Sequence, residues 1–328
     1  MNVAVLIVNW NGGDLLSRCL RCLAGQRRRP DHVIVVDNAS TDDSLQLAAA
    51  ELDGVELIRL SQNFGFARAN NIAVAAAGRF DLVALLNPDA FPEPEWLGAL
   101  MAAAESAPAN VAAFASQMLL DGAPEYLDGA GDSYHVSGRA WRNGHREARA
   151  NWPTSNREVF AACAAAALYR RRAFTEIGGF DEEYFSYFED VDLGFRLRLR
   201  GYDCVYVPAA VVRHVSSALG GYRSNFAVYH GERNAVWTFV KDMPSPLLWV
   251  YLPQHLILNL AALLYYPLRG QGGVVLKAKI DALRGLPSVL KKRRQVQATR
   301  RSDAWTVRRA LHRGIGAPFI ARYSMPPA

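Results

Sequence analysis

Cysteine is scarce in the sequence, and the four cysteines suit neither a disulfide framework nor a zinc site. Cys19 and Cys22 form a lone C-x-x-C pair inside a segment whose apolar residues recur at helical spacing. A zinc site would need further ligands, and a redox motif would need a thioredoxin-like setting. We therefore expect this pair to be buried helix thiols, and so little cysteine is typical of a protein from a reducing compartment.

Phosphate-binding signatures are also absent. The chain contains no G-x-x-x-x-G-K-[ST] motif, and no G-x-G-x-x-G motif follows its first apolar run. These absences exclude a P-loop and argue against dinucleotide binding. We expect a bound diphosphate to be held through a metal ion rather than by a glycine-rich cradle. The first residues include no positively charged leader and no cleavage site, so we expect them to form a core strand rather than a signal peptide.

Acidic residues are rare in the C-terminal part. Past Arg269 only Asp281 and Asp303 are acidic, whereas Lys and Arg are frequent, and the whole chain has a net charge of +6. The rest of the chain is therefore close to neutral or acidic. This basic tail raises the hypothesis of a nucleic-acid-binding protein, but the tail contains no recognised module, and charge alone is not specific.

Apolar runs alternate with helical patterns along a chain of 328 residues that is 51% hydrophobic. β-branched runs predict strands at 3–8, 32–36, 55–60, 81–86, 111–118, 203–207 and 211–215. Helices are predicted at 14–24, 44–52, 67–77, from the prolines near 92 to about 106, at 170–177 and at 225–242. We interpret 120–151 as an irregular excursion, 158–169 as either strand or helix, and 216–224 as flexible. The alternation indicates an α/β fold with a doubly wound, mostly parallel sheet.

Polar clusters follow four of the predicted strands, at Asn9–Asn11, Asp37–Asp42, Asn63–Asn71 and Asn87–Asp89. Ligands of such sheets bind beyond the carboxyl ends of the strands. Each cluster could be only a turn, because Asn, Asp and Gly dominate turns. That alternative explains less well why several other turns lack such polar residues. As a nucleotide site, Asp37 would accept hydrogen bonds from base or ribose, and Asp89 would bind Mg²⁺ or Mn²⁺ on a diphosphate.

The stretch Phe180–Tyr202, FDEEYFSYFEDVDLGFRLRLRGY, mixes carboxylates with aromatic rings ahead of a basic helix. Carboxyl groups beside aromatic rings lose hydration, which raises their pKa and suits a general base. The alternative is a helix start, where negative charge is favoured. Asp192 and Arg196 have the spacing of a helical ion pair, so we give Asp192 a structural role. Glu189 and Asp190 remain candidates for chemistry.

Residues 244–268 are apolar and aromatic but are interrupted by Pro253 and by nearby polar residues. Pro253 argues against a simple membrane span, although the length would suffice. Trp249 and the neighbouring tyrosines resemble interfacial anchors, and the basic helices that follow would complement anionic lipids. A buried hydrophobic hairpin or an interface in a homo-oligomer is the alternative. Between the two we favour contact with a membrane surface.

Several of these motifs occur together in a fixed order. VAVLIVNWNG, VVDNASTDDS, NFGFARANN, LLNPDA, the stretch 180–202 and HGERN resemble glycosyltransferase family 2, most closely its bacterial rhamnosyltransferase-type members. The resemblance covers about residues 1–240. It implies a GT-A fold, a nucleotide-sugar donor, Mg²⁺ or Mn²⁺, and inversion at the anomeric carbon. We expect a catalytic domain at 1–242 and a C-terminal apolar and basic helical segment at 243–328.

The resemblance assigns roles to individual residues. The donor-binding candidates are Asn9, Asp37, Asn63, Gly65, Ala67, Arg68, Asn70, Asn87 and Arg233. Asp89 and His214 are the metal candidates. Asn87 replaces the first aspartate of the family's D-x-D motif, which puts the metal affinity in doubt. Asp190 matches the catalytic base and would deprotonate the acceptor hydroxyl, while Glu189 would position the acceptor.

The expected reaction transfers a sugar, rhamnose from its dTDP donor or another dTDP- or UDP-linked sugar, to a cell-envelope glycan or polyprenyl-linked acceptor. The expected location is cytoplasmic, peripheral on the inner face of the cytoplasmic membrane, and nucleic acid is not an expected partner. A nucleotidyltransferase that releases pyrophosphate is an alternative enzyme.

Overall fold

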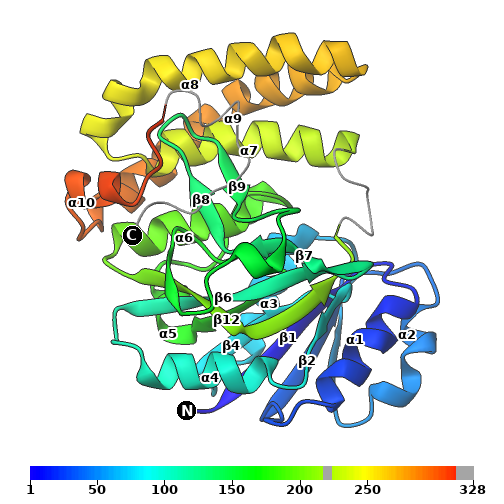
Figure 1. The fold of residues 1–328 in the computed structure, drawn as a ribbon. Coiled ribbons are helices and arrows are strands. Elements are labelled where there is room, and N and C mark those ends of the chain that lie inside the picture. Colours follow the sequence, from blue (N-terminus) through cyan, green and yellow to red (C-terminus); the bar gives the residue numbers. More distant parts are fainter. Residues whose placement is uncertain (217–223, 315–328) are drawn as a thin grey trace.

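The computed structural model describes residues 1–216 and 224–314, and a ten-stranded mixed sheet forms its centre (Figure 1). The main path through the sheet is β10 (Arg157–Val159), β12 (Asp203–His214), β6 (Val111–Leu120), β11 (Ala166–Arg170), β4 (Leu82–Leu86), β1 (Val3–Asn9), β2 (His32–Asp37) and β3 (Glu56–Arg59). β4, β1, β2 and β3 pair in parallel, as do β6 and β12, whereas β11 runs antiparallel between these groups. The carboxyl ends of β1, β2 and β4 therefore lie at one edge.

Helices cover both faces of the sheet. On one face α1 (Asp14–Ala24) and α4 (Trp96–Ser106) bury their apolar residues against the strands. On the other face lie α3 (Gly65–Ala76), α5 (Arg171–Glu176) and α6 (Glu189–Leu199). The central strands are apolar on both sides because both sides are covered, as expected for parallel strands.

Three segments refine the predicted local structure. The helix predicted at 44–52 is a single turn, α2 (Ser44–Leu47), followed by a 3₁₀ turn, η1 (Ala49–Glu51). The strands predicted at 203–207 and 211–215 are one strand, β12, with a register shift between Val207 and Val211. Pro208 lies in that gap, and it has no N–H to donate to a ladder. The segment 158–169 contains the end of β10 and the start of β11, joined by a loop.

The excursion at 120–151 is more regular than predicted. It contains β7 (Ala123–Ala130), which pairs with β6, and the hairpin of β8 (Asp132–Tyr134) and β9 (Ala140–Arg142), followed by a 3₁₀ turn, η2 (Arg149–Asn151). Its glycines and charged residues concealed these short strands. The flexible stretch predicted at 216–224 lies almost entirely outside the described residues.

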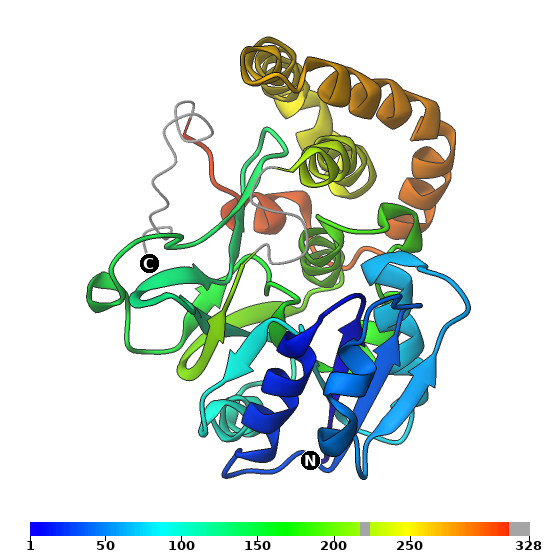
Figure 2. The ribbon, with the colours of Figure 1, turned by 90° about the vertical axis from the view of Figure 1, so that its right-hand side faces the viewer.

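Helices also form a third layer above α6, drawn at the top of Figure 1. It consists of α7 (Asn225–Asp242), α8 (Ser245–Tyr265), η4 (Tyr266–Arg269), α9 (Gly272–Ala298) and α10 (Ala304–Arg309). Figure 2 shows α7 end-on, enclosed by α8 and α9. Ion pairs hold α9 to α7 and to the layer below: Lys279 contacts Glu232 of α7 at 2.6 Å, and Lys292 pairs with Asp181. Part of the basic tail thus neutralises acidic residues of the same chain.

Only one helical stretch in the described part of the chain, Ser245–Arg269, is long and apolar enough to cross a membrane, with a mean hydropathy of 1.6. Only 17% of its most apolar window is buried. α8 continues through Pro253, so this proline does not divide the helix as its position in the sequence indicated. Pro253 is exposed, and the carbonyl that loses its intrahelical partner there can reach solvent.

Candidate active site

A pocket of about 1230 Å³ opens at the sheet edge where β1 and β4 end. One wall comes from these strand ends, a second from the start of α6, and a third from α7 and α8. The predicted residues that line it are Asn63, Gly65, Asn87, Asp89, Glu189, Asp190 and His214. The other predicted residues, Asn9, Asp37, Ala67, Arg68, Asn70 and Arg233, are not among its lining residues.

Asp89 and His214 meet because β5 (Ala90–Pro92) pairs antiparallel with β12, with His214 opposite Ala90. The Nε2 atom of His214 lies 3.3 Å from Oδ1 of Asp89. The Nδ1 atom of His214 lies 2.7 Å from Oδ2 of Asp128, a fully buried residue of β7. Arg142 contacts the same Asp128 oxygen at 2.6 Å. Burial lowers the pKa of His214, but Asp128 and Asp89 outweigh it and raise that pKa to about 9.

This arrangement fits a divalent cation. Nε2 of His214 is buried, makes no hydrogen bond to residues 1–216 and 224–314, and faces the Asp89 carboxylate. A metal-binding histidine usually has its other ring nitrogen held by a carboxylate or carbonyl, as Asp128 holds Nδ1 here. Carboxylate and imidazole are suitable ligands for Mn²⁺, and carboxylate for Mg²⁺. The sequence did not indicate Asp128, because β7 was not predicted.

Asn9 and Asp37, the last residues of β1 and β2, are buried next to residues that line the pocket. Nδ2 of Asn9 donates to Oδ1 of Asp37 at 3.0 Å, and the same oxygen accepts from Ser40 Oγ at 2.6 Å. These bonds fix the loops after β1 and β2 against each other. The next residue, Asn38, lines the pocket and donates to Oδ1 of Asn63 at 2.8 Å. Asp37 is therefore a buried anchor at the strand end where a nucleoside was expected to bind.

The start of α3 carries the segment NFGFARANN and packs against Phe185 in the loop before α6. Gly65 has φ +82°, and a Cβ there would lie 2.5 Å from the ring of Phe185. The backbone N–H of Ala67 donates to the Phe185 carbonyl at 3.2 Å. Asn70 donates to its own helix at Phe66, and Arg68 lies 3.6 Å from Glu182. Gly65 and Ala67 thus contact and position the neighbouring loop, while the Asn70 side chain bonds within its own helix.

The loop 185–188 has an unusual backbone that α7 stabilises. Phe185, Tyr187 and Phe188 all have positive φ values, between 65° and 69°. Such conformations cost about 1–3 kcal/mol per residue and persist only where the surroundings impose them. Nδ2 of Asn234 donates to the carbonyls of Tyr184, Ser186 and Tyr187 at 2.7–3.1 Å. Asn234, which was not among the predicted site residues, therefore holds the loop that leads into α6.

Arg233 is placed differently from its prediction. Its guanidinium donates to the carbonyls of Glu183 and Tyr184 at 3.1 and 3.0 Å and stacks over Trp237. These contacts turn it toward the same loop rather than toward the pocket. The sequence predicted a donor-binding arginine on this helix, and in the structure its side chain binds carbonyls at the start of the loop that leads into α6.

Asp190 lies at the start of α6 and is half-buried at the pocket wall. Its carboxylate accepts from the backbone N–H of Ala164 at 3.2 Å and of Val191 at 2.8 Å. Burial raises its pKa against the effect of these donors. Glu189 is buried, and its Oε2 atom has no hydrogen-bond partner in the part of the chain that the structure describes. Burial and the nearby Asp190 raise the pKa of Glu189 well above its usual value.

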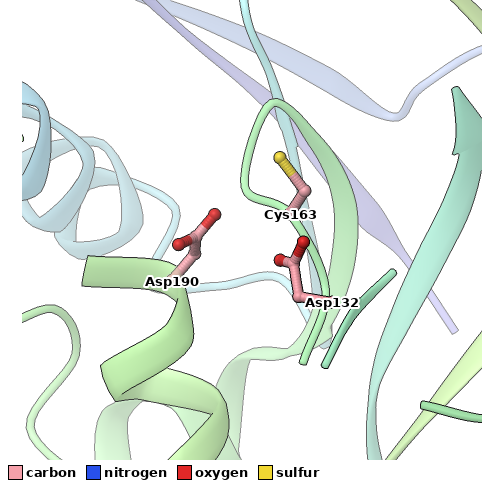
Figure 3. Close-up of side chains that lie close together, drawn as sticks. All are labelled: Asp132, Cys163 and Asp190. Atoms are coloured by element: carbon pink, nitrogen blue, oxygen red, sulfur yellow. The ribbon is translucent and has the colours of Figure 1, made fainter. Parts of the chain in front are cut away.

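Two neighbours of Asp190 were not predicted. Figure 3 shows Asp132 and Cys163 pointing toward the Asp190 carboxylate from two other segments. The carboxylate oxygens and the sulfur lie within 4.8 Å of one another. Asp132 begins β8, and Cys163 lies in the loop before β11. Neither position shows a recognisable sequence signal, because the fold alone brings these three segments together.

Asp192 has the structural role predicted for it. It lies 2.6 Å from Arg196, as the i,i+4 spacing indicated, and 2.5 Å from Lys241 of α7. Tyr184 also donates to it at 3.1 Å. These cations overcome the cost of burial and hold the pKa of Asp192 well below its usual value.

With the site described, comparison with known proteins identifies the family. The family described as "Glycosyltransferase like family 2" matches residues 1–235. The chain belongs to this family. An N-acetylglucosaminyl-diphospho-decaprenol L-rhamnosyltransferase of Mycobacterium tuberculosis is 32% identical over 280 residues, which cover 75% of this chain and 87% of that protein. An O-antigen chain rhamnosyltransferase of Salmonella typhimurium is 26% identical and covers 65% of this chain and 66% of its own.

Solved structures confirm the GT-A fold of this family member. Residues 1–349 of Staphylococcus aureus TarS, in complex with UDP-GlcNAc, align with a TM-score of 0.52 at 18% identity, over 95% of this chain and 93% of that one. The mannosyltransferase PcManGT of Pyrobaculum calidifontis, in complex with GDP-Man and Mn²⁺, aligns with a TM-score of 0.54 at 17% identity, over 86% of this chain and 87% of that one.

Proposed function

We propose that this family 2 glycosyltransferase transfers rhamnose from dTDP-rhamnose, with inversion, to a hydroxyl group of a polyprenyl-linked glycan. One observation carries the reaction type: a single pocket contains Asp190, which forms no ion pair with the described residues, and the Asp89–His214 pair that fits a metal ion. The choice of rhamnose rests on the relatives, two of which are named rhamnosyltransferases. The name of the mycobacterial relative also supports the lipid-linked acceptor.

Asp190 accepts the proton of the acceptor hydroxyl, whose oxygen attacks the anomeric carbon on the face opposite the diphosphate. The two backbone N–H groups that bind Asp190 fix the direction of its carboxylate. Burial raises the pKa of Glu189, which favours the protonated form that can donate a hydrogen bond to the acceptor. A divalent cation held by Asp89 and His214 would neutralise charge on the departing diphosphate. Asn87 adds an uncharged oxygen to this part of the pocket.

The pocket wall formed by α7 and α8 supports a lipid-linked acceptor. Its α8 residues are mainly apolar, with Leu258, Ala261 and Ala262 among them, and they face the same pocket as Asp190. The outer side of α8 is also apolar: Trp249, Leu260 and Leu264 are 58–69% exposed. A polyprenyl chain could leave the pocket along this helix without entering water.

The same surface supports peripheral binding to the cytoplasmic membrane. α8 contains no Asp, Glu, Lys or Arg, and α9 beside it contributes exposed Leu283 and Leu290 together with many lysines and arginines. Exposed apolar residues and basic residues together favour anionic lipid surfaces. Co-sedimentation with vesicles tests this part, with anionic vesicles expected to bind the protein more than zwitterionic ones. Replacement of Trp249 and Leu260 by Ala should weaken binding, and equal binding of this variant would contradict the assignment.

Calorimetry and turnover with a panel of nucleotide sugars test the donor and the metal. With Mn²⁺ we expect dTDP-rhamnose to bind and to be consumed, in preference to UDP-GlcNAc and GDP-mannose. Asp89→Ala should remove the metal-dependent part of donor binding. Equal donor binding by the wild type in EDTA would contradict the metal role. Preference for another nucleotide sugar would contradict the assignment of rhamnose as the donor sugar.

Two other outcomes would favour the alternatives. Release of pyrophosphate from a nucleoside triphosphate would indicate a nucleotidyltransferase. A salt-dependent shift with DNA, without donor binding, would indicate a nucleic-acid-binding protein.

A further inference from the structure

Asp132 is fixed against the segment that also holds the catalytic candidate. Its backbone N–H donates to the carbonyl of Ala161 at 2.8 Å, and its carbonyl accepts from Phe160 at 3.1 Å. Three residues further on, Ala164 donates its N–H to Asp190. Gly131 precedes Asp132 with φ +72°, and a Cβ at Gly131 would lie 2.7 Å from Val159. The backbone thus fixes where the Asp132 and Asp190 carboxyl groups stand.

The Asp132 side chain is enclosed and lacks a partner. It is 4% exposed and lines the pocket. No hydrogen bond or ion pair of its carboxyl group occurs among residues 1–216 and 224–314. Buried carboxylates of structural importance normally have such partners. One of its oxygens lies within 4.8 Å of an Asp190 carboxylate oxygen and of the Cys163 sulfur. A side chain held this firmly beside the base, yet unpaired, requires an explanation other than folding.

We propose that Asp132 is a positioning residue for the base, remaining protonated and donating a hydrogen bond to the ionised Asp190, directly or through one water molecule. This role rests on the proposed transfer reaction. Two neighbouring carboxyl groups in an enclosed site cannot both ionise readily, so the pair retains one proton. In the reaction the acceptor O–H bond breaks and an O–H bond to Asp190 forms. The acceptor oxygen bonds to the anomeric carbon, and the diphosphate leaves with the electron pair, so Asp132 keeps its own proton throughout.

The surrounding groups decide which carboxyl group carries the proton. Asp190 accepts two backbone N–H bonds, which favour its ionised form, whereas Asp132 accepts none from its side chain. Burial and the Asp190 charge raise the pKa of Asp132 well above its usual value. Arg142 of β9 is the cation facing both groups, but it pairs with Asp128 of β7 at 2.6 Å. Cys163 is buried, and burial raises the pKa of its thiol, so it adds no charge.

The pH dependence of kcat/KM distinguishes this role from the alternatives, with Asp132→Asn and Asp132→Ala as a matched pair. Asn keeps a donor of the same shape, so the acid limb, set by Asp190, should keep its midpoint. Ala removes the donor that favours ionised Asp190, so the midpoint should move to higher pH, and kcat should fall about 10- to 100-fold. Donor affinity should change in neither variant. If Asp132 is instead ionised, both variants should move the midpoint of the acid limb to lower pH, and this result would overturn the proposal. Midpoints that stay unchanged in both variants would overturn it as well.

Infrared difference spectroscopy supplies a readout that does not depend on turnover. The wild type minus Asp132→Asn spectrum at neutral pH should contain the C=O band of a protonated carboxyl group. A carboxylate band in its place would overturn the proposal. If no sugar nucleotide is consumed by the wild type, the proposed function fails, while this spectrum still decides the protonation state of Asp132.

Discussion

Asp190 and Asp192 lie in the first turn of α6, yet their surroundings are opposite. Asp192 is completely buried between Arg196 and Lys241, and both cations form ion pairs with its carboxylate. Asp190 faces the pocket with only backbone donors, next to Asp132, another carboxyl group. Correspondingly, Arg196 and Lys241 hold the pKa of Asp192 well below its usual value despite burial, whereas burial raises the pKa of Asp190. The paired carboxylate stabilises the fold, and the unpaired one is available for chemistry.

Removing the charge of Asp192 should have the largest effect on stability. Asp192→Asn leaves Arg196 and Lys241 buried with less compensation, and breaking a buried ion pair in this way costs about 3–5 kcal/mol. Urea unfolding followed by circular dichroism measures this free energy. The matched control is Asp190→Asn, which leaves no cation behind and should not destabilise the protein. Similar losses in both variants would mean that the two carboxylates do not differ as described.

Replacing Asn234, which holds the loop before α6, should lower the stability by a smaller amount. Asn234→Ala removes three hydrogen bonds from a loop with three residues at positive φ. We expect a loss of about 1–3 kcal/mol in unfolding free energy. We also expect kcat to fall by up to about 100-fold, because a misplaced base reacts poorly. Measured donor affinity should stay close to that of the wild type. Unchanged kcat would show that Asn234 serves stability alone.

The fold and part of the site could be predicted from the sequence, whereas contacts between distant residues could not. The order of strands and helices, the position of α6 and the structural role of Asp192 followed from apolar periodicity and i,i+4 spacing. Asp132, Asp128 and Asn234 did not, because each acts on a residue far away in the chain. Arg233 was assigned to the donor from its helix alone, and only tertiary contacts reveal that it binds the loop. Short strands such as β7 and β8, rich in glycine and charge, had no clear pattern.

The smallest effects should appear in the pH dependence of stability. The folded-state pKa of Asp192 is depressed, so its contribution is complete above its unfolded value, near pH 4, and is lost as pH falls below that. The folded-state pKa of Asp190 is raised, so ionising it opposes folding as pH rises above about 4. At pH 7, Asp190→Asn should therefore be slightly more stable than the wild type. Unfolding between pH 3 and pH 8 should show this gain disappearing toward pH 3, and a gain that persists there would contradict the assignment.

The most direct test of the account is single-turnover transfer by Asp190→Asn. The amide keeps the shape of the side chain but cannot accept the proton, so the chemical step should slow by about 10²- to 10⁴-fold. Calorimetry of the same variant with the donor nucleotide and Mn²⁺ should give the wild-type affinity. Loss of transfer with intact donor binding is the predicted result. Transfer at the wild-type rate would contradict the central claim that Asp190 is the base.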